Sequence, residues 1–359
     1  MNLSEIRLCD FRNCANLHID PSPRFNILEG LNGQGKTNIL ESIYVMASLK
    51  SFRASSSSEL IRFGCTQAEL RGIVQHDSSE RVIRMMFGNR SRRVSIDGKS
   101  VRSMAESIGQ LSVVLFAPEH LTITKGSPSE RRKFLDRALF NRWPSSLTDA
   151  KRYQDVLKQR NALLKNNGSD EMLVVYDEQL ADAAALLLKW RNQFLDALHP
   201  IFTDTLAELT NGQLEGKLTY QNKLECDQAD DITKKLHSDW HRDRMRGSTN
   251  KGPHVDDIDV QLNGRSARSF ASQGQHRAIV LALKISEIRL LKRDLGYSPI
   301  LLLDDVSSEL DMERNSLLMN YLCSDEFGGQ VFMTTTTREV LQIDDMDHTC
   351  FKIRAGEIV

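Results

Sequence analysis

Residues 25–40 read FNILEGLNGQGKTNIL. The stretch begins with an apolar run typical of a buried strand, and from residue 37 it continues with the apolar spacing of a helix. Between the two stand three glycines and a lysine. Glycine lets the backbone bend so that several N–H groups face one point, and such a turn before a helix favours an anion. The stretch therefore predicts a strand, a phosphate-binding loop and a helix.

The loop itself, GLNGQGKT, matches GxxxxGK[ST] at every fixed position. In loops of this kind the lysine reaches the β- and γ-phosphates and the hydroxyl of the last residue ligates Mg²⁺. We therefore expect a nucleoside triphosphate together with Mg²⁺. The expected nucleotide-binding residues are Gly30, Leu31, Asn32, Gly33, Gln34, Gly35, Lys36 and Thr37. Of these, Thr37 is also an expected metal ligand.

A second pattern, ILLLDD at residues 300–305, is an apolar run that ends in two carboxylates. A continuous apolar run is typical of a buried parallel strand, and ligands bind at the carboxyl ends of such strands. Asp304 is then placed to hold Mg²⁺ and is the second expected metal ligand. Asp305 is placed to orient or deprotonate an attacking water and is the expected catalytic residue.

A third pattern, ASQGQ at residues 271–275, precedes a stretch with helical spacing. A serine hydroxyl and a glycine N–H at a helix start can form a second anion site, and they are equally compatible with an ordinary helix N-cap. These five residues do not decide between the two interpretations.

The order of the three patterns resembles that of ABC-type ATPases, which have a Walker A loop, a signature, a Walker B strand and a D-loop. SSELD at residues 307–311 occupies the D-loop position. In that superfamily the signature of one copy caps the γ-phosphate held by the other. The resemblance therefore implies that Ser272, Gly274 and Gln275 bind nucleotide in trans, and that the chain forms an ATP-dependent homodimer.

Length, composition and net charge indicate the compartment and limit how the chain could bind nucleic acid. The chain has 359 residues, with 40% hydrophobic residues, 26% charged residues and a formal net charge of −1. No apolar run is long enough to span a bilayer and no signal peptide is visible, so we expect a cytoplasmic protein without membrane contact. Any nucleic-acid binding requires a local basic face, because the net charge offers no general attraction.

Along the chain, strand-like and helix-like signals alternate at both ends, and Leu-, Ala-, Lys- and Glu-rich helical patterns dominate at 129–166 and 171–211. The region from about 226 to 253 is polar and reads as irregular. We predict an α/β fold: an ABC-type P-loop ATPase head with an inserted, mostly helical second lobe. The expected segments are the N-terminal half of the ATPase lobe at 1–125, the helical lobe at 126–245, and the C-terminal half of the ATPase lobe at 246–359.

Several further stretches are distinctive: DFRN at 10–13, PEHL at 118–121, GSPSERRKFLD at 126–136, QRNALL at 159–164 and GPHVDD at 252–257. Together they resemble the RecF family of bacterial recombination and repair ATPases, and the resemblance runs from about residue 3 to residue 355. Its most specific part is PEHL followed by GSPSERRKFLD.

The RecF resemblance implies a function in recombinational repair and replication-fork maintenance. It implies DNA as a ligand, both single-stranded and gapped duplex, with RecR and RecO as partners and RecA reached indirectly. ATP would close the dimer on DNA at gaps and double-strand/single-strand junctions, and slow hydrolysis would release it. The expected activity is a weak DNA-dependent ATPase that acts as a switch.

Two departures from the general ABC pattern favour slow hydrolysis. Transporter ATPases usually have Glu after the Walker B Asp, whereas this chain has Asp305, whose carboxylate is one methylene shorter. Where a switch histidine is usual, the chain reads TTTT at 334–337. Threonine can hydrogen-bond a phosphate or a water but cannot carry a positive charge.

Three basic clusters are candidate DNA contacts: 90–93, 131–133 and 241–246. Each is also compatible with a solvated face or an internal set of ion pairs, and Arg131 and Arg132 are alternatively candidates for the nucleotide interface. Aromatic residues make up only 6% of the chain, which favours recognition of the DNA backbone or shape over base reading.

Two rival classes remain. A transporter ATPase subunit would need a helical subdomain that docks on membrane helices, and an SMC-type chromosome-structural head would need a long coiled coil, for which this chain has little room. DNA-stimulated ATPase activity distinguishes the repair protein from the transporter subunit.

Overall fold

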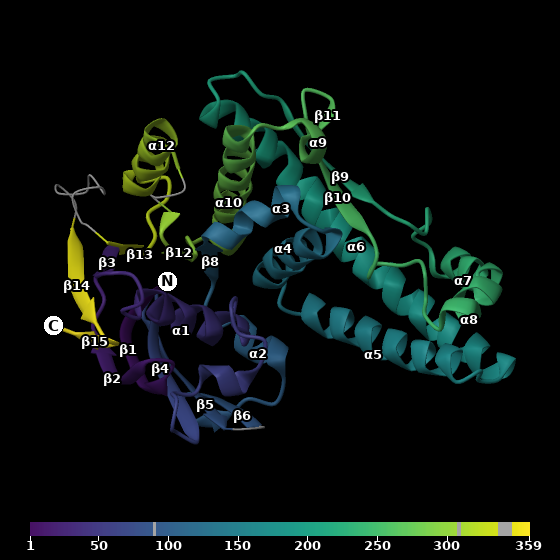
Figure 1. Ribbon diagram of the computed structural model, residues 1–359, viewed down its shortest axis with the longest axis horizontal. Coiled ribbons are helices and arrows are strands. Elements are labelled where there is room, and N and C mark those ends of the chain that lie inside the picture. Colours follow the sequence, from purple (N-terminus) through teal and green to yellow (C-terminus); the bar gives the residue numbers. More distant parts are fainter. Residues whose placement is uncertain (89–90, 307–309, 337–346) are drawn as a thin grey trace. The chain divides into compact units, whose positions relative to one another are not determined.

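The structure is a computed structural model that describes residues 1–88, 91–306, 310–336 and 347–359. The chain divides into two compact units (Figure 1). The first unit combines Met1–His120 with Glu287–Val359, and the second unit is Leu121–Ser286. The first unit is therefore built from both ends of the sequence, as the split α/β pattern predicted.

A six-stranded sheet in the first unit contains the strand that precedes the phosphate loop and the strand that precedes Asp304 and Asp305. Its order is β15-β14-β3-β13-β12-β8, and the neighbours from β14 to β8 are parallel. The apolar runs predicted as strands pair here residue by residue, for example Leu303 with Met333. The strands are β3 (Phe25–Glu29), β8 (Val113–Phe116), β12 (Ile300–Leu303), β13 (Val331–Thr335), β14 (His348–Arg354) and β15 (Glu357–Ile358).

A second, antiparallel sheet of the first unit has the order β2-β1-β4-β5-β6-β7. The predicted hairpin at DGK is confirmed, since Asp97 and Gly98 both have positive φ, at 50° and 77°, between two paired strands. The strands are β1 (Asn2–Phe11), β2 (Cys14–Ile19), β4 (Gln67–His76), β5 (Ser79–Gly88), β6 (Ser91–Ile96) and β7 (Lys99–Ser100).

Helices of the first unit cover these sheets. Helix α1 follows β3 directly and buries Ile39, Leu40 and Ile43 completely, so the predicted apolar face lies in the core. The other helical segments are α2 (Met104–Ile108), α12 (Met312–Cys323) and the short 3₁₀ turns η1 (Ser57–Leu60) and η2 (Pro118–Leu121), and α1 itself is Lys36–Ser48.

The second unit is mostly helical and also holds a small sheet of order β11-β10-β9. Helix α6 is the longest, with 40 residues, and its apolar stripe packs against α5 and α7 around Leu180, Leu187 and Leu188. The elements are α3 (Thr122–Lys125), α4 (Pro128–Arg142), α5 (Ser146–Lys165), α6 (Asp170–Leu209), β9 (Gly216–Gln221), α7 (Ala229–Ser238), α8 (Trp240–Arg246), β10 (Asp257–Leu262), β11 (Arg265–Ser266), α9 (Ala267–Phe270) and α10 (Gln273–Leu295), which continues into the first unit.

Two sequence expectations differ from this architecture. The region 226–253 was expected to be irregular, but it contains α7 and α8. The expected lobe boundary at 245/246 also differs from the observed one at 286/287. The reason is a long-range pairing: all six residues of β10 pair with β9, which follows α6, so the segment that carries residues 271–275 packs with the helices.

A buried ion network ties α5, α6 and α8 together. Arg160 and Asp177 both have side chains that are 0% exposed, and the guanidinium Nε lies 2.6 Å from the Asp177 carboxylate. Nη1 of Arg160 donates to Asp243 and to the hydroxyl of Thr249, both at 2.7 Å. Trp240 donates its indole N–H to the other oxygen of Asp177 at 2.6 Å. One buried cation therefore serves two buried carboxylates.

Replacing Arg160 tests this network. Arg160→Met should lower the free energy of unfolding of the second unit by about 3–5 kcal/mol, because it leaves two buried carboxylates without their cation. Urea unfolding followed by the fluorescence of the chain's three tryptophans measures the loss. Arg242→Met is the control, since Arg242 has a mostly exposed side chain 3.4 Å from Asp239, and its loss should be small. Equal effects of the two substitutions would contradict the account.

A second polar pair joins α5 to the segment before β10. The Tyr153 hydroxyl lies 2.6 Å from Nδ1 of His254, and Nε2 of His254 lies 3.0 Å from the carbonyl oxygen of Thr249. The two contacts fit a neutral imidazole, with Nε2–H donating to the carbonyl and Nδ1 accepting from the hydroxyl. Burial lowers the pKa of His254, against the opposing effect of the Thr249 hydrogen bond.

This lowered pKa predicts a pH dependence of stability. The unfolded chain binds a proton on His254 at a higher pH than the folded chain, so stability should fall as the pH drops from about 7.5 through the ordinary histidine pKa of about 6.5. His254→Gln keeps an amide donor and acceptor but cannot titrate, and it should flatten this slope. Urea unfolding at several pH values measures it, and an unchanged slope in His254→Gln would contradict the assignment.

Candidate functional site

The phosphate loop, residues 30–37, connects β3 to α1 as predicted. Gly33 and Gly35 have φ of 79° and 108°, a backbone region that favours glycine. At Gly30 a Cβ atom would lie 2.4 Å from the carbonyl oxygen of Ile353. Gly33 and Gly35 thus permit the turn and Gly30 permits a close approach of β14, so each of the three glycines in the loop has a structural requirement.

Residues far away in the sequence hold the loop in shape. The Asn13 amide donates to the carbonyl of Gln34 at 3.1 Å and its oxygen accepts from Asn38 at 2.8 Å. From the β14–β15 turn, the backbone N–H groups of Ala355 and Gly356 donate to the side chain and the carbonyl of Gln34, each at 2.8 Å. Both ends of the chain therefore brace the loop.

Lys36 is enclosed by the loop that it belongs to. The residue is only 7% exposed, and its ammonium donates to the carbonyls of Gly30 at 2.5 Å and Leu31 at 3.0 Å. Burial lowers the pKa of Lys36, against the opposing charges of Asp305 and Asp304. An anion bound in the loop would give this buried cation a charged partner in place of two carbonyl dipoles.

Asp304 lies where β12 ends, beside the start of α1. It is 7% exposed, and one carboxylate oxygen accepts from the hydroxyls of Thr37 at 2.8 Å and Thr334 at 3.0 Å. Burial raises the pKa of Asp304, although the two hydroxyl hydrogen bonds oppose the shift. The structure therefore brings together the two predicted metal ligands, which are distant in sequence.

The spacing of these two oxygens fits Mg²⁺. Ligands on adjacent corners of an octahedron of radius about 2.0–2.1 Å lie about 2.9 Å apart, and the Thr37 hydroxyl and the Asp304 carboxylate are separated by 2.8 Å. Both are oxygen donors, which Mg²⁺ prefers. The donor set and its geometry are compatible with a magnesium ion held by these two residues.

Asp305 follows in a left-handed backbone conformation, with φ of 50°. Its backbone N–H donates to the Thr334 hydroxyl at 2.8 Å, and that hydroxyl donates in turn to Asp304. Thr334, the first residue of the TTTT run, thus fixes both aspartates. Thr335 pairs with β3, Thr336 borders the cavity described next, and Thr337 lies outside the described residues.

A cavity of about 460 Å³ opens over these groups and is called here the nucleotide cavity. Six of the predicted residues of the phosphate loop border it, together with Asp304 and Asp305. Two further lining residues, Thr334 and Thr336, belong to the TTTT run that stands in place of a switch histidine, whereas sequence reasoning did not assign the remaining ones to the site: Asn38, Arg53, Pro118 and Glu119. Glu119 stands in the PEHL stretch directly after β8, so its position at the end of a parallel strand was a usable signal; Arg53 offered none.

The signature loop, residues 271–275, belongs to the second unit. The Ser272 hydroxyl accepts from the backbone N–H of Gln275 at 3.2 Å, and the Gln275 side chain accepts from the backbone N–H of Ser272 at 2.8 Å. This reciprocal pair is a capping box at the start of α10. Ser272 is exposed and Gly274 and Gln275 are partly exposed, so the N-cap geometry leaves the loop open to solvent.

The D-loop residues 307–309 lie outside the described residues. Its last residue, Asp311, caps α12 by accepting from the backbone N–H of Arg314 at 2.9 Å.

The basic clusters serve internal contacts in part. Arg131 is buried and forms a two-pronged ion pair with Asp257 at 2.7 and 2.8 Å, while Arg132 donates to the carbonyl of Asp256 at 2.7 Å. Arg92 donates to the Leu49 carbonyl. In the third cluster, the partners of Arg242, Arg244 and Arg246 are Asp239, Asp170 and Asn250.

None of the helices in the described part of the chain combines the length and apolar character needed to cross a bilayer.

Comparison with known proteins places the chain in a family. The model of the RecF/RecN/SMC N-terminal domain matches residues 2–358. A DNA replication and repair protein RecF from Citrifermentans bemidjiense is 40% identical over 366 residues, covering 100% of both chains. A RecF protein from Myxococcus xanthus is 41% identical over 372 residues, covering 100% of this chain and 97% of the relative.

Solved structures agree with the sequence relatives. The structure described as the recombination mediator protein RecF-ATP in the RecFOR pathway has a TM-score of 0.90 and 33% identity, with 99% of this chain and 96% of the other covered. An SMC head bound to the C-terminal winged-helix domain of ScpA has a TM-score of 0.58 at 17% identity, which shows a shared fold. The predicted ABC-type ATPase fold is thus confirmed, and the chain belongs to the RecF family.

Proposed function

We propose that this protein is an ATP-switched DNA-binding protein of recombinational repair and replication-fork maintenance. The observation that carries the proposal is the nucleotide cavity, in which a glycine loop, a buried lysine and a Thr37–Asp304 pair meet at one edge of a parallel sheet. ATP in the solved RecF structure and repair in the names of the relatives support the same reading.

In this proposal the phosphate loop binds the triphosphate through its backbone N–H groups and Lys36. Thr37 and Asp304 would hold Mg²⁺, which would supply positive charge beside the phosphates. Asp305 borders the same cavity and orients the attacking water. Its left-handed backbone, fixed through Thr334, sets the direction in which its short side chain points.

The second unit supplies the other half of the switch. Ser272, Gly274 and Gln275 stand at the N-terminal end of a 23-residue helix, whose dipole favours an anion. We assign this loop to the γ-phosphate held by a second copy, so that two ATP molecules are enclosed in a homodimer. In the capping box the Ser272 hydroxyl only accepts, so its O–H can still donate to that phosphate, whereas the backbone N–H donates to the Gln275 side chain and would have to leave it.

DNA and repair proteins complete the proposed cycle. The ATP-closed dimer binds single-stranded or gapped duplex DNA at junctions, acts there with RecO and RecR, and promotes RecA loading. Slow hydrolysis then releases the DNA. Family membership and the RecFOR context of the solved relative support these partners. Because the net charge of the chain is near neutral, it favours DNA binding that requires the closed dimer.

The proposed switch predicts that ATP makes the chain associate. With ATP and Mg²⁺ the mass in solution, measured by light scattering, should double relative to nucleotide-free or ADP-bound protein, and the dimer should retain gapped duplex DNA. Lys36→Met and Ser272→Arg should each abolish the dimer, because one removes the phosphate contact and the other blocks the signature. A chain that stays monomeric with ATP, or a Ser272→Arg variant that dimerises normally, refutes the trans assignment.

The different roles proposed for the two aspartates predict different effects of their substitution. Asp304→Asn should remove the Mg²⁺ dependence of ATP binding, because the amide is a poor metal ligand. Asp305→Asn should keep Mg²⁺-dependent ATP binding but slow single-turnover hydrolysis by about 10²–10⁴-fold, the usual contribution of a positioned base. Titration with a fluorescent ATP analogue, with and without Mg²⁺, and a quenched single-turnover assay distinguish the variants. The assignment fails if the two variants behave alike.

A further inference from the structure

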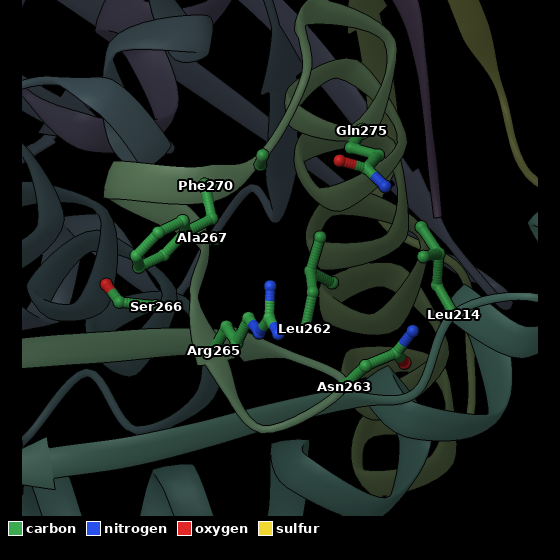
Figure 2. A pocket seen from close by; sticks show the side chains of 9 residues that line it. Leu214, Leu262, Asn263, Arg265, Ser266, Ala267, Phe270 and Gln275 are labelled. Atoms are coloured by element: carbon green, nitrogen blue, oxygen red, sulfur yellow. The ribbon is translucent and has the colours of Figure 1, made fainter.

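A hollow of about 350 Å³ lies within the second unit, next to the signature loop (Figure 2). The β10–β11 hairpin, α9 and the first turn of α10 form its walls. Its lining residues are Leu214, Leu262, Asn263, Arg265, Ser266, Ala267, Phe270, Ala271 and Gln275. Ala271 and Gln275 belong to the signature loop as well, so the hollow and the signature loop share a wall.

The hollow has a firm apolar base. Leu262 is 7% exposed and Ala267 is 1% exposed. The hairpin turn at Asn263 is fixed, because its backbone N–H donates to the carbonyl of Glu215 at 2.9 Å and its side chain accepts from the N–H of Glu215 at 2.8 Å. At the rim stands Phe270, a large aromatic side chain that is 69% exposed. An exposed ring beside a preformed hollow offers a flat apolar surface to a ligand.

The charge of the hollow is not neutralised. Among the described residues, the side chain of Arg265 has no hydrogen-bond or ion-pair partner, and Figure 2 shows this side chain extending from the hairpin into the hollow. Gln275 reaches in from the other side. Its oxygen is used by Ser272, whereas its amide nitrogen has no partner in the described part of the chain. The hollow therefore offers two unused donors, one of them charged, beside an aromatic ring and an apolar base.

A ligand that matches this set is anionic at one end and flat and apolar at another, and a nucleotide has both properties. We propose that the hollow receives the nucleoside part of the ATP held by a second copy, with Phe270 stacked on the base and Arg265 paired with a phosphate nearer the sugar. This inference rests on the proposed trans signature. The γ-phosphate at Ser272 is one end of an extended molecule, and the hollow is the surface that adjoins Ser272 through Ala271 and Gln275.

The proposal has a specific consequence for ligand choice. Stacking on an aromatic ring tolerates every base, because each base has a π-face. Dimerisation should therefore accept ATP and GTP alike where the phosphate loop of the second copy binds them, but inorganic tripolyphosphate, which lacks a nucleoside, should not support it.

The test compares variants within the second unit. Phe270→Ala and Arg265→Ala should each weaken ATP-driven dimerisation about 5- to 150-fold, measured by light scattering against protein concentration. Binding of a fluorescent ATP analogue to the dilute monomer should stay unchanged, because the phosphate loop is in the other unit. Phe270→Tyr should restore dimerisation. The matched controls are Arg268→Ala, which is on α9 with Phe270 but outside the lining, and Met245→Ala, which is 78% exposed on α8.

Tryptophan fluorescence adds a signal that does not depend on the affinity of the dimer. In Phe270→Trp the new indole should be quenched or shifted by ATP, but not by ADP and not when Lys36→Met is also present, after subtraction of the parent chain's three tryptophans. If Phe270→Ala and Arg265→Ala dimerise like the parent, or tripolyphosphate suffices, this inference is wrong while the proposed function stands. If the parent chain does not dimerise with ATP, the proposed function itself fails.

Discussion

A buried carboxylate is the constraint on which the nucleotide cavity depends. Asp304 sits at 7% exposure at the end of β12, and its ionised form is unfavourable there unless hydroxyl groups or a cation compensate it. Thr37 and Thr334 supply hydroxyls from the neighbouring elements α1 and β13. These hydrogen bonds bring the end of the phosphate loop, the two aspartates and the threonine run to one point, and a divalent cation would complete the compensation.

The signature loop depends on a second set of buried polar contacts. The segment 249–257 contacts α5 through His254 and Thr249, and α4 through Asp256 and Asp257. It leads into β10, whose hairpin and α9 end at the signature loop. The long helices thus determine where the loop stands. A basic cluster that resembles a DNA contact in sequence, at 131–133, is part of this framework.

Local patterns were predictable because their physics is local. Glycines with positive φ, an apolar strand ending in carboxylates and a DG turn each follow from neighbouring residues, and the phosphate loop, β12 and the β6–β7 hairpin lie where expected. The bracing of Gln34 by Asn13 and Gly356 was not predictable, since both ends of the chain meet there only after folding. Residues 246–286 group with the helices in the structure for the same reason, because the β9–β10 pairing joins distant segments.

The central claim is that the phosphate loop of one copy works with the signature loop of another. Mixing Lys36→Met with Ser272→Arg protein tests it most directly, because only a mixed pair would hold one complete site: the intact loop of the Ser272→Arg copy under the intact signature of the Lys36→Met copy. Native mass spectrometry with ATP and Mg²⁺ should show mixed dimers carrying ATP, although neither variant associates alone. Absence of mixed dimers, when the parent chain dimerises with ATP, would contradict the claim.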